Sequence, residues 1–201
     1  MSQTVKAQDD RDALPLWRQP LARSLYKTKN VPECRYMQLA TVTKDGMPKN
    51  RTVVFRGFDD MHRIIIISDS RMDKWNEISQ NKWIALCWYF STTREQYRIE
   101  GRAELIIDPE HEYEHQRVHH WQQLSAPAKR QFLWGEPKSK REPGDNLQVD
   151  KHLLNAGPPD HFGLIVVDVR SVDYLNLKGN PQDRTLYRKS STQWRATPVI
   201  P

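Results

Sequence analysis

The chain has 201 residues, of which 37% are hydrophobic and 28% are charged, and its formal net charge is +6. That length suits one domain whose apolar residues are concentrated in a few elements. The basic excess favours anionic partners, but no long block of like charges and no basic stretch interleaved with aromatic residues indicates a nucleic-acid surface. The two distant cysteines, Cys34 and Cys87, fit neither a disulfide framework nor a zinc site.

The start of the chain, residues 1–14, is mostly polar and mixed in charge. This composition predicts a disordered leader rather than a signal peptide. No apolar run in the chain is long enough to span a membrane. We therefore expect a cytoplasmic protein without a membrane or nucleic-acid partner, folding as a single domain over residues 15–201.

The first half of this domain is predicted to be a helix followed mainly by strands. Leu16, Trp17, Leu21 and Leu25 have near-helical spacing and predict a helix over Pro15–Lys27. The period then becomes that of strands. Strands are predicted over Met37–Thr43, Asn50–Arg56 and Arg63–Ser68, as an antiparallel meander, and over Trp83–Phe90 and Glu95–Leu105. A short helix, Met72–Asn81, precedes the last two strands, and Asp69 can cap its first turn.

The second half begins with a helical and loop insertion at about residues 109–160. Pro109–Leu133 has a helical pattern, whereas Trp134–Pro159 has little periodicity and predicts a long loop or a lid. Strands then return over Gly163–Val169, Val172–Leu177, Thr185–Arg188 and Gln193–Pro198. Because strands outnumber helices and no strand-helix unit repeats, we expect a β-rich α+β fold, an antiparallel barrel with peripheral helices.

Metal and nucleophile chemistry receive little support from the sequence. His111, His115, His119 and His120 include pairs four residues apart, a spacing that can bind a metal on a helix. No matching cysteine or carboxylate set accompanies them, so a solvated helix is favoured and no metal site is predicted. Hydrolase, nucleotide triphosphatase and Rossmann motifs are also missing from the sequence.

Four segments, in chain order over roughly Met37–Pro201, resemble the pyridoxamine 5′-phosphate oxidase-like FMN-binding split-barrel family. Leu39–Gly46, Pro48 and Arg51–Gly57 are similar to its opening hairpin and its Arg-x-Val-x-x-Lys flavin strand, with Arg56 at the Lys position. Ile67–Ser68, Arg71 and Lys74 are similar to its phosphate-gripping turn, Gln96 to a glutamine on a central strand, and Asp183–Tyr187, Trp194, Arg195 and Pro201 to its C-terminus. A basic pair beside a helix N-terminus suits a phosphate dianion.

The resemblance implies FMN as the cofactor. The cofactor-binding residues that it implies are Arg51, Thr52, Val53, Val54, Phe55, Arg56, Ile67, Ser68, Arg71, Lys74, Gln96 and Arg184. Strand alternation would place Arg51 and Arg56 on opposite faces, so either the strand bends between them or only Arg51 reaches the phosphate.

The family's substrate residues are matched less well. Tyr113 and Arg117 stand at two positions of its Tyr-x-x-x-Arg-x-x-x-Ser helix, whereas Trp121 replaces the serine. Asn180-Pro181-Gln182 stands where pyridoxamine phosphate oxidases carry Arg-x-His, and the flavin-stacking tryptophan corresponds to Leu175. Tyr113 and Arg117 remain the substrate-binding candidates, although a Tyr and an Arg four residues apart also often pair locally. The resemblance thus supports FMN better than it supports pyridoxamine phosphate.

The function implied is an FMN-dependent oxidoreductase that acts on an unidentified small substrate by hydride transfer to the flavin. This chemistry requires no catalytic side chain from the protein, and none is predicted. Two alternatives stay open: a non-catalytic flavin or haem carrier or sensor on the same fold, and a true pyridoxamine 5′-phosphate oxidase. The family's flavin sits at a dimer interface, so we expect a homodimer in which each subunit supplies part of the site.

Overall fold

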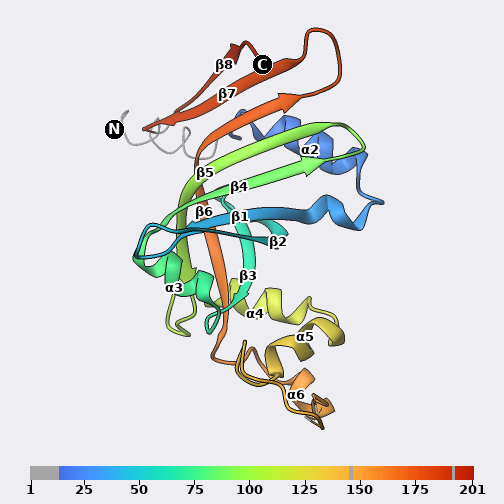
Figure 1. The fold of residues 1–201 in the computed structure, drawn as a ribbon, viewed down its shortest axis with the longest axis vertical. Helices are drawn as coiled ribbons and strands as arrows, with labels where there is room; N and C mark the ends of the chain where they lie inside the picture. The colour runs from blue at the N-terminus through green and yellow to red at the C-terminus, as the bar shows by residue number, and fades with distance from the viewer. Residues whose placement is uncertain (1–13, 145–146, 192) are drawn as a thin grey trace, which may run out of the picture.

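In the part of the chain that the computed structural model describes, residues 14–144, 147–191 and 193–201, eight antiparallel strands form one sheet. The strand order is β3-β2-β1-β4-β5-β6-β7-β8, and an additional pairing between β3 and β6 closes the first six strands into a barrel (Figure 1). The strands are β1 (Tyr36–Val42), β2 (Pro48–Phe58), β3 (Ile64–Asp69), β4 (Trp83–Phe90), β5 (Glu95–Ile106), β6 (Phe162–Asn176), β7 (Asp183–Ser190) and β8 (Gln193–Val199). The predicted antiparallel barrel and its opening meander are confirmed.

Strand β6 differs from the sequence prediction, which divided this region into two strands. It is one 15-residue strand that pairs with β5 along its length. Its first half, Phe162–Val167, also pairs with β3, and its second half, Ser171–Asn176, pairs with β7. A register shift opposite Glu100 and Gly101 leaves Arg170 as the extra residue of a bulge, which is where the predicted break lies. β7 and β8 therefore extend the sheet beyond the closed barrel.

The helices lie around the barrel. Their bounds are α2 (Arg18–Lys27), a short 3₁₀ turn over Pro32–Arg35, α3 (Asp73–Gln80), α4 (Glu114–Gln122), α5 (Ala126–Leu133) and α6 (Lys151–Asn155). α6 lies inside the segment predicted to be an irregular loop. Residues 1–13 of the predicted leader are outside the described residues.

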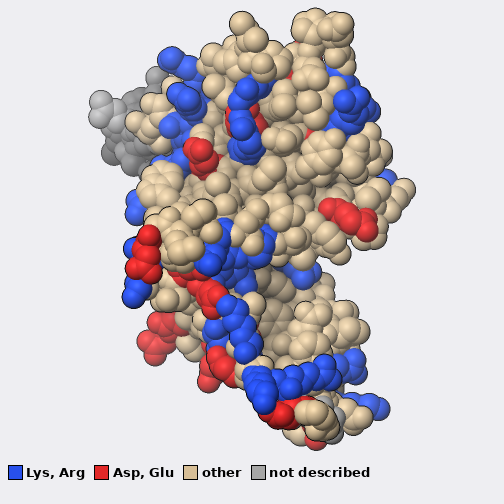
Figure 2. All heavy atoms as spheres, viewed as in Figure 1, with Lys and Arg blue, Asp and Glu red and all other residues tan. Residues whose placement is uncertain are grey.

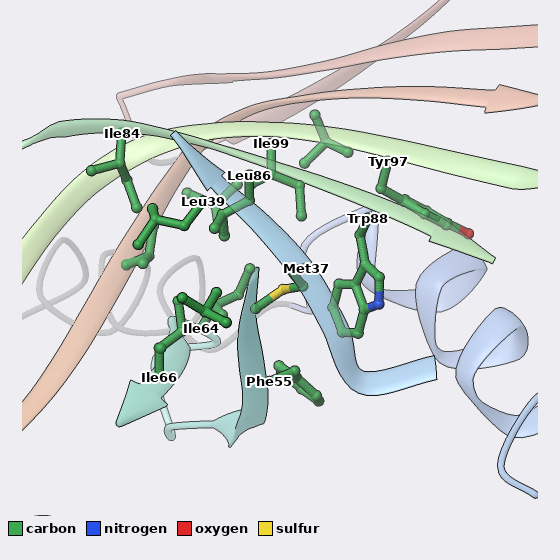
Figure 3. Packing of buried hydrophobic residues seen from close by; sticks show 14 of the residues in the cluster. Met37, Leu39, Phe55, Ile64, Ile66, Ile84, Leu86, Trp88, Tyr97 and Ile99 are labelled. Atoms are coloured by element: carbon green, nitrogen blue, oxygen red, sulfur yellow. The ribbon is translucent and has the colours of Figure 1, made fainter. Parts of the chain in front are cut away.

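The barrel interior forms the main hydrophobic core (Figure 3). Met37, Leu39, Leu86, Trp88 and Ile99 point into it from adjacent strands, as period-two alternation requires. Trp17, which precedes α2, Leu21 of α2 and Ile78 of α3 complete this core. α2 and α3, which lie outside the insertion, therefore pack against the barrel core.

A second core holds the insertion against the outside of the barrel. Ile65 of β3, together with Phe162 and Leu164 of β6, packs with Trp121 and Leu124 from the helical insertion. Both faces of β3 are consequently buried, which explains its unbroken run of four isoleucines, Ile64–Ile67. The insertion is thus fixed beside β3, close to the start of α3 (Figure 1).

Candidate functional site

Arg51, the first of the predicted phosphate contacts, is already paired within the chain. It lies on the same face of β2 as the buried Val53. Its Nη2 donates to Glu77 Oε2 at 2.7 Å, and its Nη1 donates to Thr41 Oγ1, which itself donates to Glu77 Oε2 at 2.5 Å. Arg51 can therefore contact an added phosphate only through N–H groups that these bonds leave free.

The rest of the predicted flavin strand alternates in the usual way. Val53 and Phe55 are buried in the barrel core, and Phe55 packs on Trp88 at 4.8 Å between ring centroids, whereas Thr52 is exposed and Val54 half-buried. The side chains of Val53 and Phe55 thus serve the core.

Arg56 is the extra residue of a bulge between β2 and β3, so the predicted irregularity is present. The bulge does not bring the side chains of Arg51 and Arg56 to one site. Arg56 lies close to His120 of α4, whereas Arg51 bonds to Glu77 of α3. Burial and the nearby charge of Arg35 lower the pKa of Arg56. The Arg56 Nε is buried without a hydrogen-bond partner among the described residues.

Arg71 is bound to Asp69 at the turn between β3 and α3. Its Nη2 donates to Asp69 Oδ2 at 2.6 Å and its Nε to Asp69 Oδ1 at 3.0 Å, while its backbone N–H also donates to Oδ1 at 2.9 Å. Burial alone would raise the pKa of Asp69, but these hydrogen bonds and the Arg71 charge outweigh it and hold that pKa below its ordinary value. Asp69 therefore organises the turn before α3 and largely neutralises Arg71. It does not cap the helix as predicted, because the N-cap residue of α3 is Met72, which has no side-chain cap hydrogen bond.

Lys74 differs from Arg51 and Arg71, which are bonded to acids, and resembles Arg56 in having no such partner among the described residues. It lies in the first turn of α3 and forms no hydrogen bond or ion pair with any residue that the structure describes. Burial, followed by the charge of Arg51, lowers its pKa. The charges of Asp69, Asp73 and Glu77 partly oppose this shift, but none of these carboxylates forms an ion pair with Lys74. A half-buried ammonium without a bonded counter-ion is suited to bind an anion.

Lys74 lines a cavity of about 680 Å³ at the junction of the barrel and the insertion. The floor includes Ile67 and the buried Ser68, which are predicted cofactor contacts, and the opposite wall includes Phe132 and Trp134. Figure 2 shows basic and acidic side chains alternating on the face that runs from α3 to the insertion. The cavity thus joins apolar and aromatic walls to an unpaired cation, as a phosphate-bearing aromatic ligand requires.

Gln96 and Arg184 form a second group, on β5 and β7, away from α3 (Figure 1). They are connected through Leu175 of β6, which is the cross-strand neighbour of both. Arg184 donates from Nη2 to Asp173 Oδ2 at 2.7 Å and from Nε to Asp173 Oδ1 at 3.0 Å, and these bonds lower the pKa of Asp173. The structure therefore divides the predicted flavin residues into two separate sets.

The predicted substrate contact Arg117 has a structural role in α4. Its side chain is buried, donates to both carboxylate oxygens of Glu114 at 2.6 and 2.9 Å, and donates to the Phe162 carbonyl at 2.9 Å. Tyr113 lies under the Arg63 guanidinium, 4.6 Å from Cζ to the ring centroid. Neither residue lines the 680 Å³ cavity.

The sequence did not predict that Glu77 and Asp173 bond to the predicted cofactor contacts Arg51 and Arg184. It also did not predict that the insertion forms part of the cavity wall. Glu77 lies within the predicted helix Met72–Asn81, but nothing in the sequence indicated that it bonds to Arg51 of β2. Among the described residues there is no group of three metal-ligating side chains and no helix long and apolar enough to cross a membrane.

Comparison with known proteins agrees with this architecture. The model for the pyridoxamine 5′-phosphate oxidase, FMN-binding domain matches residues 14–107. An Arabidopsis thaliana protein named pyridoxine/pyridoxamine 5′-phosphate oxidase 2 is 36% identical over 167 residues, 82% of this chain and 84% of that protein. A pyridoxamine 5′-phosphate oxidase-related, FMN-binding protein from Nostoc punctiforme PCC 73102 has a crystal structure with a TM-score of 0.83 and 36% identity, covering 94% of this chain and 100% of its own. PhzG from Burkholderia lata 383, with a TM-score of 0.76, 20% identity and 96% of each chain covered, shares the fold. The chain therefore belongs to the pyridoxamine 5′-phosphate oxidase-like FMN-binding split-barrel family, an oxidoreductase-type class.

Proposed function

We propose that this protein is an FMN-dependent oxidoreductase acting on a small substrate that is still to be identified. The observation that carries the proposal is the unpaired Lys74 in the wall of a 680 Å³ cavity beside the start of α3. Helix N-termini and lysine ammonium groups together neutralise phosphate. The membership of the family supports the same cofactor.

In this proposal the residues of the chain bind and orient the cofactor. Lys74 holds the phosphate, and Ser68 lies beside it in the cavity wall, with its hydroxyl donating to the Asp69 carbonyl at 3.2 Å. Glu77 fixes the orientation of Arg51, whose charge acts on Lys74. FMN, when bound, supplies the redox chemistry by accepting a hydride from a substrate carbon. The protein's remaining task is to exclude water and to place the substrate.

Replacing Lys74 by alanine tests the site. The loss of one charge-assisted contact should cost about 1.5 to 3 kcal/mol, which weakens FMN binding roughly 10- to 100-fold. Titration of FMN into apo-protein, followed by quenching of flavin fluorescence, measures the dissociation constant. Lys82→Ala removes an exposed lysine outside the cavity and is the matched control. Equal dissociation constants for wild type and Lys74→Ala would remove Lys74 from the site.

A second candidate function, pyridoxine or pyridoxamine 5′-phosphate oxidase, is favoured by the name of the Arabidopsis relative. Arg117 argues against it, because its guanidinium is occupied by Glu114 and the Phe162 carbonyl. Asn180 and Gln182 also lack the charge of the family's Arg-x-His pair. We therefore expect weak or no turnover of pyridoxamine phosphate, and a kcat/KM of about 10⁴ M⁻¹s⁻¹ or more would establish the oxidase instead.

The alternative of a carrier or sensor without turnover is separated by spectroscopy. Two flavin bands in the visible spectrum of the purified protein support FMN, whereas a Soret band would identify haem. A flavin that is bound but is not reduced by any tested substrate class would favour the carrier.

A further inference from the structure

The segment Trp134–Arg141, here called the strap, forms the outer wall of the cavity that contains Lys74. It follows α5 directly, and Trp134, Pro137 and Arg141 line the cavity opposite Ile67 and Lys74. The strap thus separates the predicted phosphate contacts from solvent on one side of the cavity.

Two ion pairs tie the strap to the beginning of α3. Lys138 Nζ donates to the Asp73 carboxylate, and Arg71 Nη1 lies 3.8 Å from Glu136 Oε2. The hydrogen bond from Lys138 is the leading reason why the pKa of Asp73 is lowered. Both partners on the α3 side lie within three residues of Lys74, so movement of the strap and access to Lys74 are coupled.

The backbone of the strap includes an unfavourable conformation that the surrounding contacts hold in place. Lys138 has a φ of 66°, in the left-handed region that non-glycine residues seldom adopt. Such a residue persists where surrounding contacts fix it, and the ion pair with Asp73 is such a contact. The indole of Trp134 also donates to the Leu147 carbonyl at 3.1 Å, which holds the start of the strap.

The charges facing the cavity are not balanced. Asp69 and Glu136 line it, but both lie against Arg71. Lys74 on the α3 side and Arg141 on the strap side have no ion-pair partner among the described residues. An anionic ligand between them would satisfy both cations at once.

We propose that the strap is a ligand-binding element: Arg141 supplies a second cation to a phosphate-bearing flavin in this cavity, and the Lys138–Asp73 and Arg71–Glu136 pairs hold the strap closed over it. This inference rests on the proposed function. Its consequence is that the flavin leaves only when the strap opens, so the rate of release depends on the Lys138–Asp73 pair, neither member of which lines the cavity.

The experiment measures FMN release and strap accessibility separately. Release is followed by the recovery of free-flavin fluorescence after holo-protein is diluted to a concentration far below its dissociation constant for FMN. Lys138→Glu should speed release about 2- to 5-fold, which is the effect of losing an exposed ion pair. The double variant Lys138→Glu with Asp73→Lys should restore the ion pair and the wild-type rate of release. Arg141→Ala should weaken FMN affinity by about 3- to 10-fold. Lys151→Ala, an exposed lysine of α6 outside the cavity, is the control.

Limited trypsin digestion provides a readout that does not depend on flavin release. FMN should slow cleavage after Lys138, Lys140 and Arg141 in the wild type, and Lys138→Glu should speed cleavage after Arg141 in the apo-protein. Stoichiometric FMN with unchanged release, affinity and cleavage in these variants would overturn the strap proposal while leaving the proposed function standing. A wild type that binds no FMN would overturn both.

Discussion

His120 in α4 is a partly buried histidine with a lowered pKa. Burial, followed by the charges of His119 and Arg56, lowers the pKa of His120 to about 4, and its Nε2 has no hydrogen-bond partner among the described residues. The folded pKa lies below the unfolded value near 6.5, so the unfolded chain binds more protons between these values. Stability contributed by neutral His120 is therefore full above about pH 6.5 and declines as the pH falls towards about 4.

Replacing His120 by glutamine should remove this part of the acid sensitivity. The full difference in pKa corresponds to about 3 kcal/mol, and solvent screening of the partly exposed ring reduces it to about 1 to 2 kcal/mol. Urea denaturation of wild type and His120→Gln at pH 7.5 and pH 5 gives the free energies of unfolding. The wild type should lose more stability than the variant between these two values, and equal losses would contradict the assignment.

For individual residues, the sequence predicted the cationic side chains of the site but not the acids to which they are bonded. Arg51, Arg71 and Arg184 were predicted to face the cofactor, yet each is bonded to an acid of the same chain. Asp69 was predicted only as a capping residue, although it is two residues from Arg71, and Glu77 reaches Arg51 from 26 residues away. This long-range pair depends on the packing of α3 against β1 and β5 of the barrel, which no local pattern encodes. Lys74 is distinguished from the other cations only by the structure.

Among the elements, the bulge in β6 depends on a close approach at Gly101 of β5. A Cβ at this position would lie 2.6 Å from the Asp168 carbonyl oxygen and 2.9 Å from Val167 Cγ1. Both atoms belong to the adjacent strand, where backbone cannot easily move aside. Gly101→Ala should therefore destabilise the barrel.

We expect this substitution to lower the free energy of unfolding by about 1 to 3 kcal/mol, as overpacking of a core usually does. Gly157→Ala is the matched control, because a Cβ there meets nothing within 4 Å. Chemical denaturation of the two variants compares them directly. If Gly101→Ala were as stable as Gly157→Ala, the strands would have to separate at the bulge without cost.

The elements themselves were largely predictable, because alternation and turn residues are local signals. β4 was predicted with its observed bounds, Trp83–Phe90, and β5 differs by one residue at its end. β6 was divided at Arg170 because a bulge interrupts periodicity in the same way as a loop. A barrel was expected from the order of strands and helices, but the pairing of β3 with β6 that closes it joins segments about a hundred residues apart, and no local signal in the sequence predicted that pairing.

At the scale of the whole molecule, the two separated sets of predicted flavin residues require an explanation. Lys74 and Ser68 lie at the cavity beside α3, whereas Gln96 and Arg184 lie on β5 and β7. One chain alone does not bring these sets together. Exposed aromatic side chains occur on the intervening strands, at Tyr36 of β1 and at Trp83 and Tyr89 of β4. Exposed aromatics of this kind are typical of a protein interface.

We therefore propose a homodimer in which a two-fold axis places the Gln96 and Arg184 set of one subunit against the Lys74 set of its partner, giving two equivalent FMN sites. A ligand that bridges two chains must stabilise the dimer by mass action, because it binds the associated state and not the separated one. Sedimentation velocity of apo-protein and holo-protein over a dilution series should show the holo-dimer persisting to lower concentration. Arg184→Ala should weaken FMN binding and reduce the difference between the concentrations at which the apo-dimer and the holo-dimer dissociate. This effect is expected although Arg184 lies far from Lys74 within its own chain. If the holo-protein sediments as a monomer with stoichiometric FMN, the site is complete within one chain, and the separation of the two sets then excludes Gln96 and Arg184 from it.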